Sequence, residues 1–296
     1  MAFGRRTRTE WKLRTRALAL GERTLVMGIL NATPDSFSDG GAFLETAAAV
    51  EWALSMLEDG ADIVDLGGES TRPGSRPVSS QEEQDRILPV AEALLRERPE
   101  CVLSVDTWHA ATALALTAAG AEIINDVSGF TWDPEMSAAC AAARCGVVLM
   151  HTRGRPDEWR TLPPLAQDDV VSLVRDGLSR QLNLAISAGV ERERIILDPG
   201  FGFGKIRENN YSLLAHLDEL QPLGRPLLAG LSRKSFLGRT AAARLRLEDL
   251  PPQARGSATI AATTATILAG VHVVRVHDVR PAVEAASIAD AILAAL

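Results

Sequence analysis

The sequence predicts an α/β fold, a single (β/α)8 (TIM) barrel with its active site at the carboxyl-terminal face of the strands. Three observations predict it. The chain has 296 residues, 46% of them hydrophobic and only 4% aromatic, which suits helices packed on a sheet. Short apolar runs alternate with longer amphipathic stretches along the whole chain. Polar residues stand where the apolar runs end.

Eight apolar runs are expected to form the strands. They cover residues 25–30, 63–66, 102–105, 122–124, 147–150, 195–197, 227–230 and 271–276. Helices are expected over residues 46–58, 81–98, 110–119, 134–144, 168–188, 211–220, 259–268 and 283–293, with a short additional helix over 235–237. Eight βα units match a closed barrel, and a doubly wound open sheet is the structural alternative.

Residues 1–20 are expected to form a basic, solvated arm, and residues 21–296 the barrel domain. Arg5 and Arg6 could suggest a twin-arginine signal, but no apolar segment of sufficient length follows. No run reaches the roughly 20 apolar residues that span a membrane. The net charge of -7 argues against a general nucleic-acid binder. Three cysteines without a C-x-x-C pair indicate reduced thiols and a cytoplasmic protein.

Polar residues follow each predicted strand. In chain order they are Asn31, residues 69–72, Asp106, Asn125, His151, Asp198, residues 232–234, and Arg275 with His277. Any one of them could be a loop residue or a helix cap, and Asp106 could cap the helix that follows it. In a barrel the ends of all eight strands converge on one face, so together these residues predict an active site.

One group of strand-end residues mixes hydrogen-bond donors with acceptors, as a flat heterocycle with ring N–H, amino and carbonyl groups requires. The group is Asp106, Asn125, Asp198 and Lys234. The planar guanidinium of Arg275 can stack on such a ring.

A second group suits phosphate oxygens. It consists of Asn31, Thr71, Arg72 and His277. The amide oxygen of Asn31 can also bind Mg²⁺, which commonly bridges to substrate phosphates. Ser235 opens a predicted helix whose free amides favour a carboxylate, although an ordinary cap without a ligand is equally compatible with the spacing.

Three other site types are not supported. Residues 200–205 resemble a phosphate-binding loop, but the spacing is incomplete and Ile206 replaces the hydroxyl residue. No His/Cys cluster has zinc spacing, and no Ser or Cys is arranged as a nucleophile with a base. Residues 31–41 and 67–75 are rich in Gly, Pro, Ser and Asp, which is typical of loops that order over a substrate.

Several segments, in this order, resemble the signatures of the dihydropteroate synthase family. They are residues 28–41, 65–74, 104–107, 124–129, 150–151, 198–205, 232–236 and 275–278, and the resemblance spans about residues 24–280. The departures are Ala32, Thr152, Ile206 and Arg207, none of which replaces a matched site residue.

The resemblance implies an enzyme of folate biosynthesis that transfers a pterinylmethyl group. Its substrates would be 6-hydroxymethyl-7,8-dihydropterin diphosphate and p-aminobenzoate, and its products 7,8-dihydropteroate and diphosphate. The resemblance further implies Mg²⁺ as cofactor, an SN1-like departure of diphosphate, a homodimer, and sulfonamides as competitors of p-aminobenzoate.

The family's residue roles carry over where the motifs match. The pterin subsite would comprise Asp106, Asn125, Met150, Asp198, Gly230, Lys234 and Arg275. The diphosphate subsite would comprise Asn31, Thr71, Arg72 and His277, with Asn31 as metal ligand. The p-aminobenzoate subsite would comprise Phe37, Thr71, Pro73, Phe203 and Ser235. The residues that act in catalysis would be Asn31, Thr71, Arg72, Lys234, Arg275 and His277.

Three other functions remain open at this point. An aldolase could use Lys234 as a Schiff base, which borohydride would trap. A non-catalytic paralogue could bind pterin as a sensor, although its loop motifs would be expected to be damaged, and here they are intact. A pterin-dependent methyltransferase would explain the pterin residues, but not residues 70–73 or 232–236.

Overall fold

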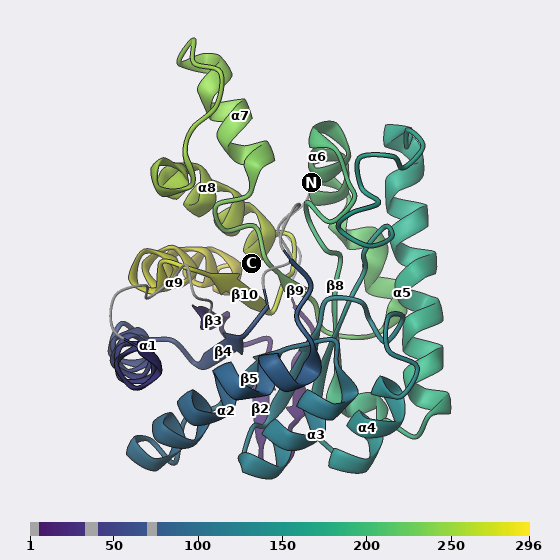
Figure 1. Ribbon diagram of the computed structural model, residues 1–296. Helices are drawn as coiled ribbons and strands as arrows, with labels where there is room; N and C mark the ends of the chain where they lie inside the picture. The colour runs from purple at the N-terminus through teal and green to yellow at the C-terminus, as the bar shows by residue number, and fades with distance from the viewer. Residues whose placement is uncertain (1–5, 33–40, 70–75) are drawn as a thin grey trace.

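The computed structural model describes residues 6–32, 41–69 and 76–296, which fold into a (β/α)8 barrel with its helices outside the strands (Figure 1). The barrel strands are β3 (Leu25–Asn31), β4 (Ile63–Gly67), β5 (Leu103–Asp106), β6 (Ile123–Asp126), β7 (Gly146–Met150), β8 (Ile195–Asp198), β9 (Leu228–Ala229) and β10 (Val273–Val276). All eight lie where the apolar runs predicted them, with shifts of one or two residues at their ends.

Strand pairing shows that the sheet closes. Its order is β8-β7-β6-β5-β4-β3-β10-β9, and every pair is parallel. The two outer strands are joined by a parallel bridge between Leu197 and Leu227, where the Leu197 N–H donates to the Pro226 carbonyl at 3.0 Å. Because neighbours in sequence are neighbours around the ring, the barrel prediction is confirmed and the open-sheet alternative is wrong.

The described helices surround this ring. They are α1 (Gly41–Glu58), α2 (Ser80–Glu97), α3 (Ala110–Ala119), α4 (Met136–Ala143), α5 (Val170–Ser187), α6 (Arg207–Ala215), α7 (Ser235–Arg244), α8 (Gly256–Leu268) and α9 (Val279–Ala294). Among these described helices none is both long and apolar enough to cross a membrane.

Two helix predictions were wrong at their carboxyl-terminal ends, and α1 and α9 begin five and four residues earlier than predicted. The helix expected over 211–220 ends at Ala215 and continues as a 3-10 helix, Leu217–Leu223, which contains Pro222. The one-turn helix expected at 235–237 is ten residues long and projects from the barrel at the top of Figure 1. The alanines at 241–243 have high helix propensity, so α7 continues beyond Gly238.

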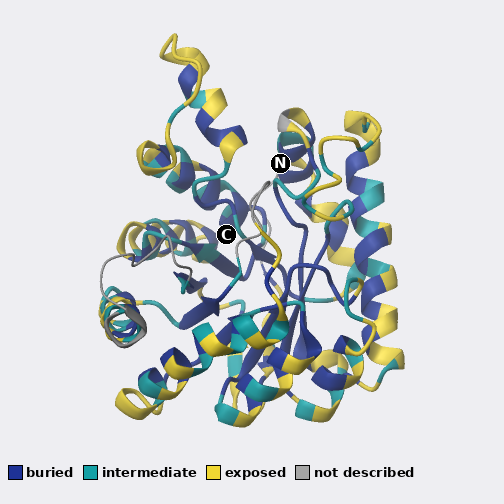
Figure 2. Ribbon diagram, in the orientation of Figure 1, coloured by how far each residue is buried: buried dark blue, intermediate teal, exposed yellow. Residues whose placement is uncertain are grey.

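Apolar side chains pack on both sides of the barrel wall. Successive side chains of a strand point to opposite faces. Val26 and Val64 thus belong to the cluster between strands and helices, whereas Met27 and Ile63 belong to a second cluster inside the barrel. In Figure 2 the barrel strands are almost entirely buried, while the surrounding helices alternate between buried and exposed residues.

The described part of residues 1–20 is a β-hairpin, so the expectation of a solvated arm was wrong. β1 (Thr9–Lys12) pairs antiparallel with β2 (Ala17–Leu20). Trp11, Leu13 and Leu20 are 0–2% exposed and join the cluster inside the barrel. The hairpin therefore closes the amino-terminal end of the barrel. Burial of its apolar side chains stabilises it in this place.

Candidate active site

Inside the barrel, the side chains change from apolar to polar between one inward-facing position of a strand and the next, which lies two residues further along. Inward positions near the amino-terminal end hold Ile63, Ile123, Val148, Ile196, Leu228 and Val273. The next inward positions on the same strands hold Asp65, Asn125, Met150, Asp198, Gly230 and Arg275. These six residues, with Asp106, line what we call the mouth, the carboxyl-terminal opening of the barrel.

Asp65 is the centre of the hydrogen bonds in the mouth. Its side chain is fully buried and accepts from Ser104 Oγ at 2.6 Å, Asn125 Nδ2 at 3.0 Å and Arg275 Nε at 2.6 Å. A buried carboxylate needs a cation and several donors to replace its hydration, and these three bonds supply both. Because Asn125 donates to Asp65 through Nδ2, its Oδ1 is left to accept from a ligand.

Arg275 is held by two carboxylates at once. Besides its bond to Asp65, its Nη2 donates to Asp106 Oδ2 at 2.6 Å. Burial raises the pKa of Asp106 above its ordinary value, against the opposing effect of Arg275. The two bonds fix the guanidinium plane, and a fixed plane is what stacking on a flat ring requires.

Asp198 presents a buried carboxylate on the other side of the mouth, paired in register with Met150. Its Oδ1 accepts from the Gly200 N–H at 2.7 Å. Burial raises the pKa of Asp198 to about 6, although the Gly200 N–H and Lys234 favour the charged form. The chain thus supplies one donor to Oδ1, and Oδ2 can accept from a ligand.

Lys234 lies against the aromatic ring of Phe203. Its Nζ is 3.9 Å from the ring centroid, and Phe203 also makes an edge contact with Trp159 at 5.4 Å. Burial and the nearby Arg275 lower the pKa of Lys234 to about 8. Phe203 was expected in the p-aminobenzoate subsite and Lys234 in the pterin subsite, and the structure places these two side chains in contact.

Lys205 stabilises the loop after β8 through hydrogen bonds to backbone carbonyls. Its Nζ donates to the carbonyls of His151, Gly200 and Phe203 at 3.1, 2.8 and 3.3 Å. Gly200 has φ +67°, and a Cβ there would lie 2.0 Å from the His151 carbonyl oxygen, so glycine is required. This lysine points into its own loop, which agrees with the rejection of a phosphate-binding loop from the sequence.

His277 is a neutral imidazole placed beside Ser232. Its backbone N–H donates to Ser232 Oγ at 3.1 Å, and its Nδ1 lies 2.9 Å from the same oxygen. Burial, Arg233 and Arg275 lower the pKa of His277 to about 3. When the Ser232 hydroxyl donates to Nδ1, the proton of the ring sits on Nε2 and can be donated to an anion. Arg233 itself is bound to Asp278 at 2.6 Å.

Asn31 lies in the same row of the sheet as two other predicted site residues. In register, Asn31 is beside Gly67, Gly67 beside Asp106, and Asp106 beside Asn125. Gly67 carries no side chain, so it leaves space between Asn31 and Asp106. No hydrogen bond found among the described residues uses the Asn31 side-chain amide, whose oxygen is of the type that Mg²⁺ binds.

The remaining predicted residues divide into three cases. Gly230 is beside Arg275, since a Cβ at 230 would lie 3.7 Å from the Arg275 Cβ. Ser235 is exposed and begins α7, as expected. The predictions for Phe37, Thr71, Arg72 and Pro73 lie outside the described residues.

Sequence patterns missed two residues and misplaced one. Asp65 was overlooked because it lies inside a strand, two residues before its end; a carboxylate within an otherwise apolar strand was the available signal. Lys205 was considered only as part of a phosphate loop. His151 was expected at the strand ends, but its ring packs outward against α5, where a Cβ at Gly177 would lie 2.4 Å from it.

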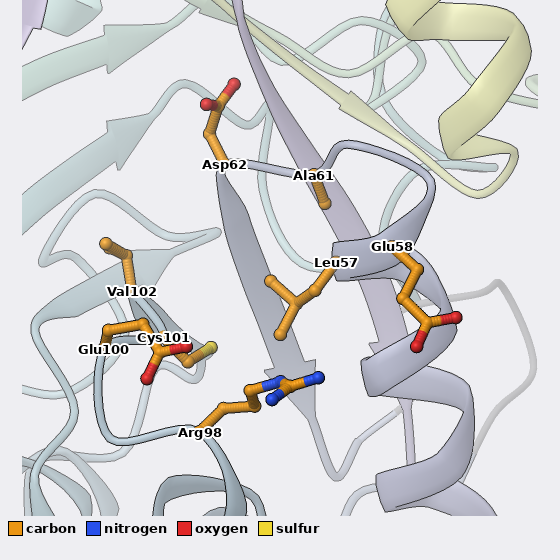
Figure 3. A pocket seen from close by; sticks show the side chains of 8 residues that line it. All are labelled: Leu57, Glu58, Ala61, Asp62, Arg98, Glu100, Cys101 and Val102. Atoms are coloured by element: carbon orange, nitrogen blue, oxygen red, sulfur yellow. The ribbon is translucent and has the colours of Figure 1, made fainter.

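A separate hollow of about 360 Å³ lies at the opposite end of the barrel (Figure 3). Ala61 and Asp62 precede β4 there, and Cys101 and Val102 precede β5. Its lining belongs to the amino-terminal side, so the hollow is not part of the mouth.

The sequence profile of the pterin binding enzymes matches residues 27–277. A curated relative, the dihydropteroate synthase of Synechocystis, is 44% identical over 272 residues, which cover 92% of this chain and 91% of the relative. The chain belongs to the dihydropteroate synthase family. It is therefore a transferase of a pterinylmethyl group.

Two solved members of the dihydropteroate synthase family share the fold. The enzyme from Xanthomonas albilineans with 4-aminobenzoic acid superposes with a TM-score of 0.87 at 41% identity, covering 97% of this chain and 99% of that one. A complex from the same organism with 7,8-dihydropteroate gives 0.83 at 39% identity, with the same coverage of both chains.

Proposed function

We propose that the chain condenses 6-hydroxymethyl-7,8-dihydropterin diphosphate with p-aminobenzoate, giving 7,8-dihydropteroate and diphosphate. The observation that carries this proposal is the arrangement of Asp198, Asn125 and Arg275 around one opening. Oδ2 of Asp198 can accept N–H groups from a pterin edge, Oδ1 of Asn125 can accept another, and the clamped Arg275 offers a face for stacking. The solved relatives that hold 4-aminobenzoic acid and 7,8-dihydropteroate support one of these substrates and this product.

Reaction begins, in this proposal, with departure of diphosphate from the pterin methylene. The electron-rich dihydropterin can carry the positive charge, so the path is SN1-like and needs no covalent nucleophile from the protein. The carboxylates of Asp65, Asp106 and Asp198 lie on the pterin side and favour that charge, while Arg275 holds the ring in place. The aniline nitrogen then forms the C–N bond to the methylene, and its proton passes to the departed diphosphate or to water.

The leaving diphosphate would be bound by Asn31, Thr71, Arg72 and His277. His277 enters neutral, and its Nε2–H donates to a phosphate oxygen as negative charge accumulates there. The available amide oxygen of Asn31 fits a Mg²⁺ ion, which when bound supplies positive charge to the diphosphate oxygens.

The p-aminobenzoate would lie against Phe203, with Phe37, Thr71, Pro73 and Ser235 completing its subsite. Sulfonamides would compete for the same place. Ser235 begins α7, and the free N–H groups of that helix end favour a carboxylate. The contact of Phe203 with Lys234 would put the aniline beside the pterin methylene.

Release of diphosphate from purified protein tests the proposal. Release should require both substrates, should fall when Mg²⁺ is removed with a chelator, and should match dihydropteroate one to one. A protein that releases diphosphate without p-aminobenzoate, or that binds pterin without turnover, would contradict it. Borohydride treatment tests the aldolase alternative, since Lys234 should form no trapped adduct with a carbonyl substrate.

We further propose that the enzyme acts in the cytoplasm. The three cysteines, Cys101, Cys140 and Cys145, are all buried and free, which suits a reducing compartment.

A further inference from the structure

A second group of ionisable side chains lies beside the mouth and takes no part in the bonds described above. Glu69 follows β4, Glu83 lies on α2, and His109 immediately precedes α3. One ligand atom from each of the three lies within 4.8 Å of the others, a grouping of His, Cys, Asp or Glu found nowhere else in the described residues.

Glu83 is the buried centre of this group. Its Oε2 accepts from Thr107 Oγ1 at 2.7 Å and lies 3.1 Å from His109 Nδ1. Glu83 is 0% exposed, yet its Oε1 has no hydrogen-bond partner among the described residues. Leaving a buried carboxylate oxygen without a donor or cation is costly, so this oxygen calls for a partner of one of these kinds.

Glu69 brings a second carboxylate to the same place. It accepts from Trp108 Nε1 at 2.8 Å and from the Val78 N–H at 3.4 Å. Burial raises the pKa of Glu69, and the neighbouring Glu83 adds to this effect. The group thus brings two carboxyl groups and one imidazole together, with Glu83 and His109 buried and Glu69 half-buried.

We propose that Glu69, Glu83 and His109 bind one divalent metal ion of the zinc type. A charge of +2 balances two carboxylates, and binding of the ion through both oxygens of Glu83 would give Oε1 its partner. The 3.1 Å between Glu83 Oε2 and His109 Nδ1 is close to the separation of about 3.3 Å between two ligands on one tetrahedral zinc ion. The ion would replace the proton in the hydrogen bond between Glu83 Oε2 and His109 Nδ1.

The chemistry of the ligands separates this site from that of Asn31. Mg²⁺ prefers oxygen ligands alone, whereas imidazole with carboxylates suits zinc and similar ions. The three residues come from the end of β4, from α2 and from the turn before α3, so a bound ion would tie these elements together beside the mouth. The inference does not depend on the proposed reaction.

Calorimetric titration of Zn²⁺ into protein stripped of metal tests the site. Wild type should bind one ion per chain, and Glu83→Gln should weaken binding by at least about tenfold. The matched control is Glu82→Gln, because Glu82 is the preceding residue of the same helix and pairs outward with Arg86. Glu82→Gln should bind as wild type does.

A histidine pair repeats the test independently. His109→Gln should lose Zn²⁺ affinity as Glu83→Gln does, whereas His216→Gln should not, because His216 is exposed, directly follows α6, and its Nδ1 lies 2.9 Å from the Ser212 carbonyl oxygen. Zn²⁺ should also raise the unfolding temperature of wild type and both controls more than that of either ligand variant. Failure of wild type to bind, or equal affinity in variants and controls, would overturn the proposal.

Discussion

Single carboxylates of the mouth differ in what they can offer a ligand. Asp65 uses its oxygens on Ser104, Asn125 and Arg275, so it organises the site without being free to bind. Asp198 accepts one backbone N–H and keeps a second oxygen available. We therefore assign Asp198 to direct recognition of the pterin and Asp65 to positioning of Asn125 and Arg275.

Replacing Asp198 by Asn should weaken pterin binding, because an acceptor becomes a donor that faces ring N–H groups. The expected loss is on the order of 1–3 kcal/mol. Calorimetric titration of a pterin measures it. Asp59→Asn is the control, since Asp59 forms an exposed pair with Arg280 far from the mouth, and it should bind normally. Unchanged affinity in Asp198→Asn would remove Asp198 from the pterin subsite.

Pterin binding should also depend on pH through Asp198. Its pKa is raised to about 6, and only the ionised carboxylate accepts two N–H groups. Affinity should therefore be constant above pH 7 and fall below pH 6, by up to about tenfold per pH unit. Titrations from pH 5 to 8 with wild type and Asp198→Asn measure this. A wild-type fall that persists unchanged in the variant would assign the titration to another group.

Replacing Asp65 by Asn should reduce stability as well as binding. The change leaves Arg275 buried with Asp106 as its remaining carboxylate, and losing one member of such a network costs about 3 kcal/mol. Urea denaturation measures the free energy of unfolding. Asp59→Asn removes only an exposed pair and should cost about 1 kcal/mol or less. Equal losses would mean that the buried bonds of Asp65 contribute no more to the free energy of unfolding than the exposed pair of Asp59 does.

Most of the site residues could be predicted as a group, because strand ends in a barrel converge whatever the helices do. Asp106, Asn125, Asp198 and Arg275 followed from that rule. Asp65 did not, since its role depends on the two-residue step inside the barrel and on three partners from other strands. His151 also failed, because a strand end does not say whether a side chain turns inward or toward a helix.

Whole elements were predictable where local pattern and packing agree. The eight strands are short apolar runs, and burial on both faces needs no other signal. The hairpin of residues 9–20 was missed because its basic residues resemble a solvated tail, although Trp11 and Leu13 alternate with charged neighbours as strand residues do. Only the structure shows that the apolar side chains of this alternation pack into the amino-terminal end of the barrel.

The hairpin should contribute substantially to stability. Trp11 is fully buried, and its Nε1 donates to the Arg194 carbonyl at 2.8 Å. Trp11→Ala should cost about 3–5 kcal/mol in free energy of unfolding. Trp52→Ala is the control, since Trp52 on α1 is 52% exposed and should cost far less. Chemical denaturation compares the two, and similar losses would show that the hairpin does not act as a structural plug.

For the whole molecule, a homodimer is expected from the family resemblance. Sedimentation equilibrium should give twice the chain mass of 31.7 kDa. A mass of one chain across the working concentration range would contradict that expectation without affecting the site in the barrel mouth.

The central claim is that the mouth of this barrel binds the pterin diphosphate. A crystal structure with that substrate, or with an unreactive analogue, tests it most directly. The account predicts the pterin edge within hydrogen-bond distance of Asp198 and Asn125, its face on Arg275, and the diphosphate toward Asn31 and His277. A ligand bound elsewhere, for example in the hollow at the amino-terminal side, with the mouth empty, would contradict the account.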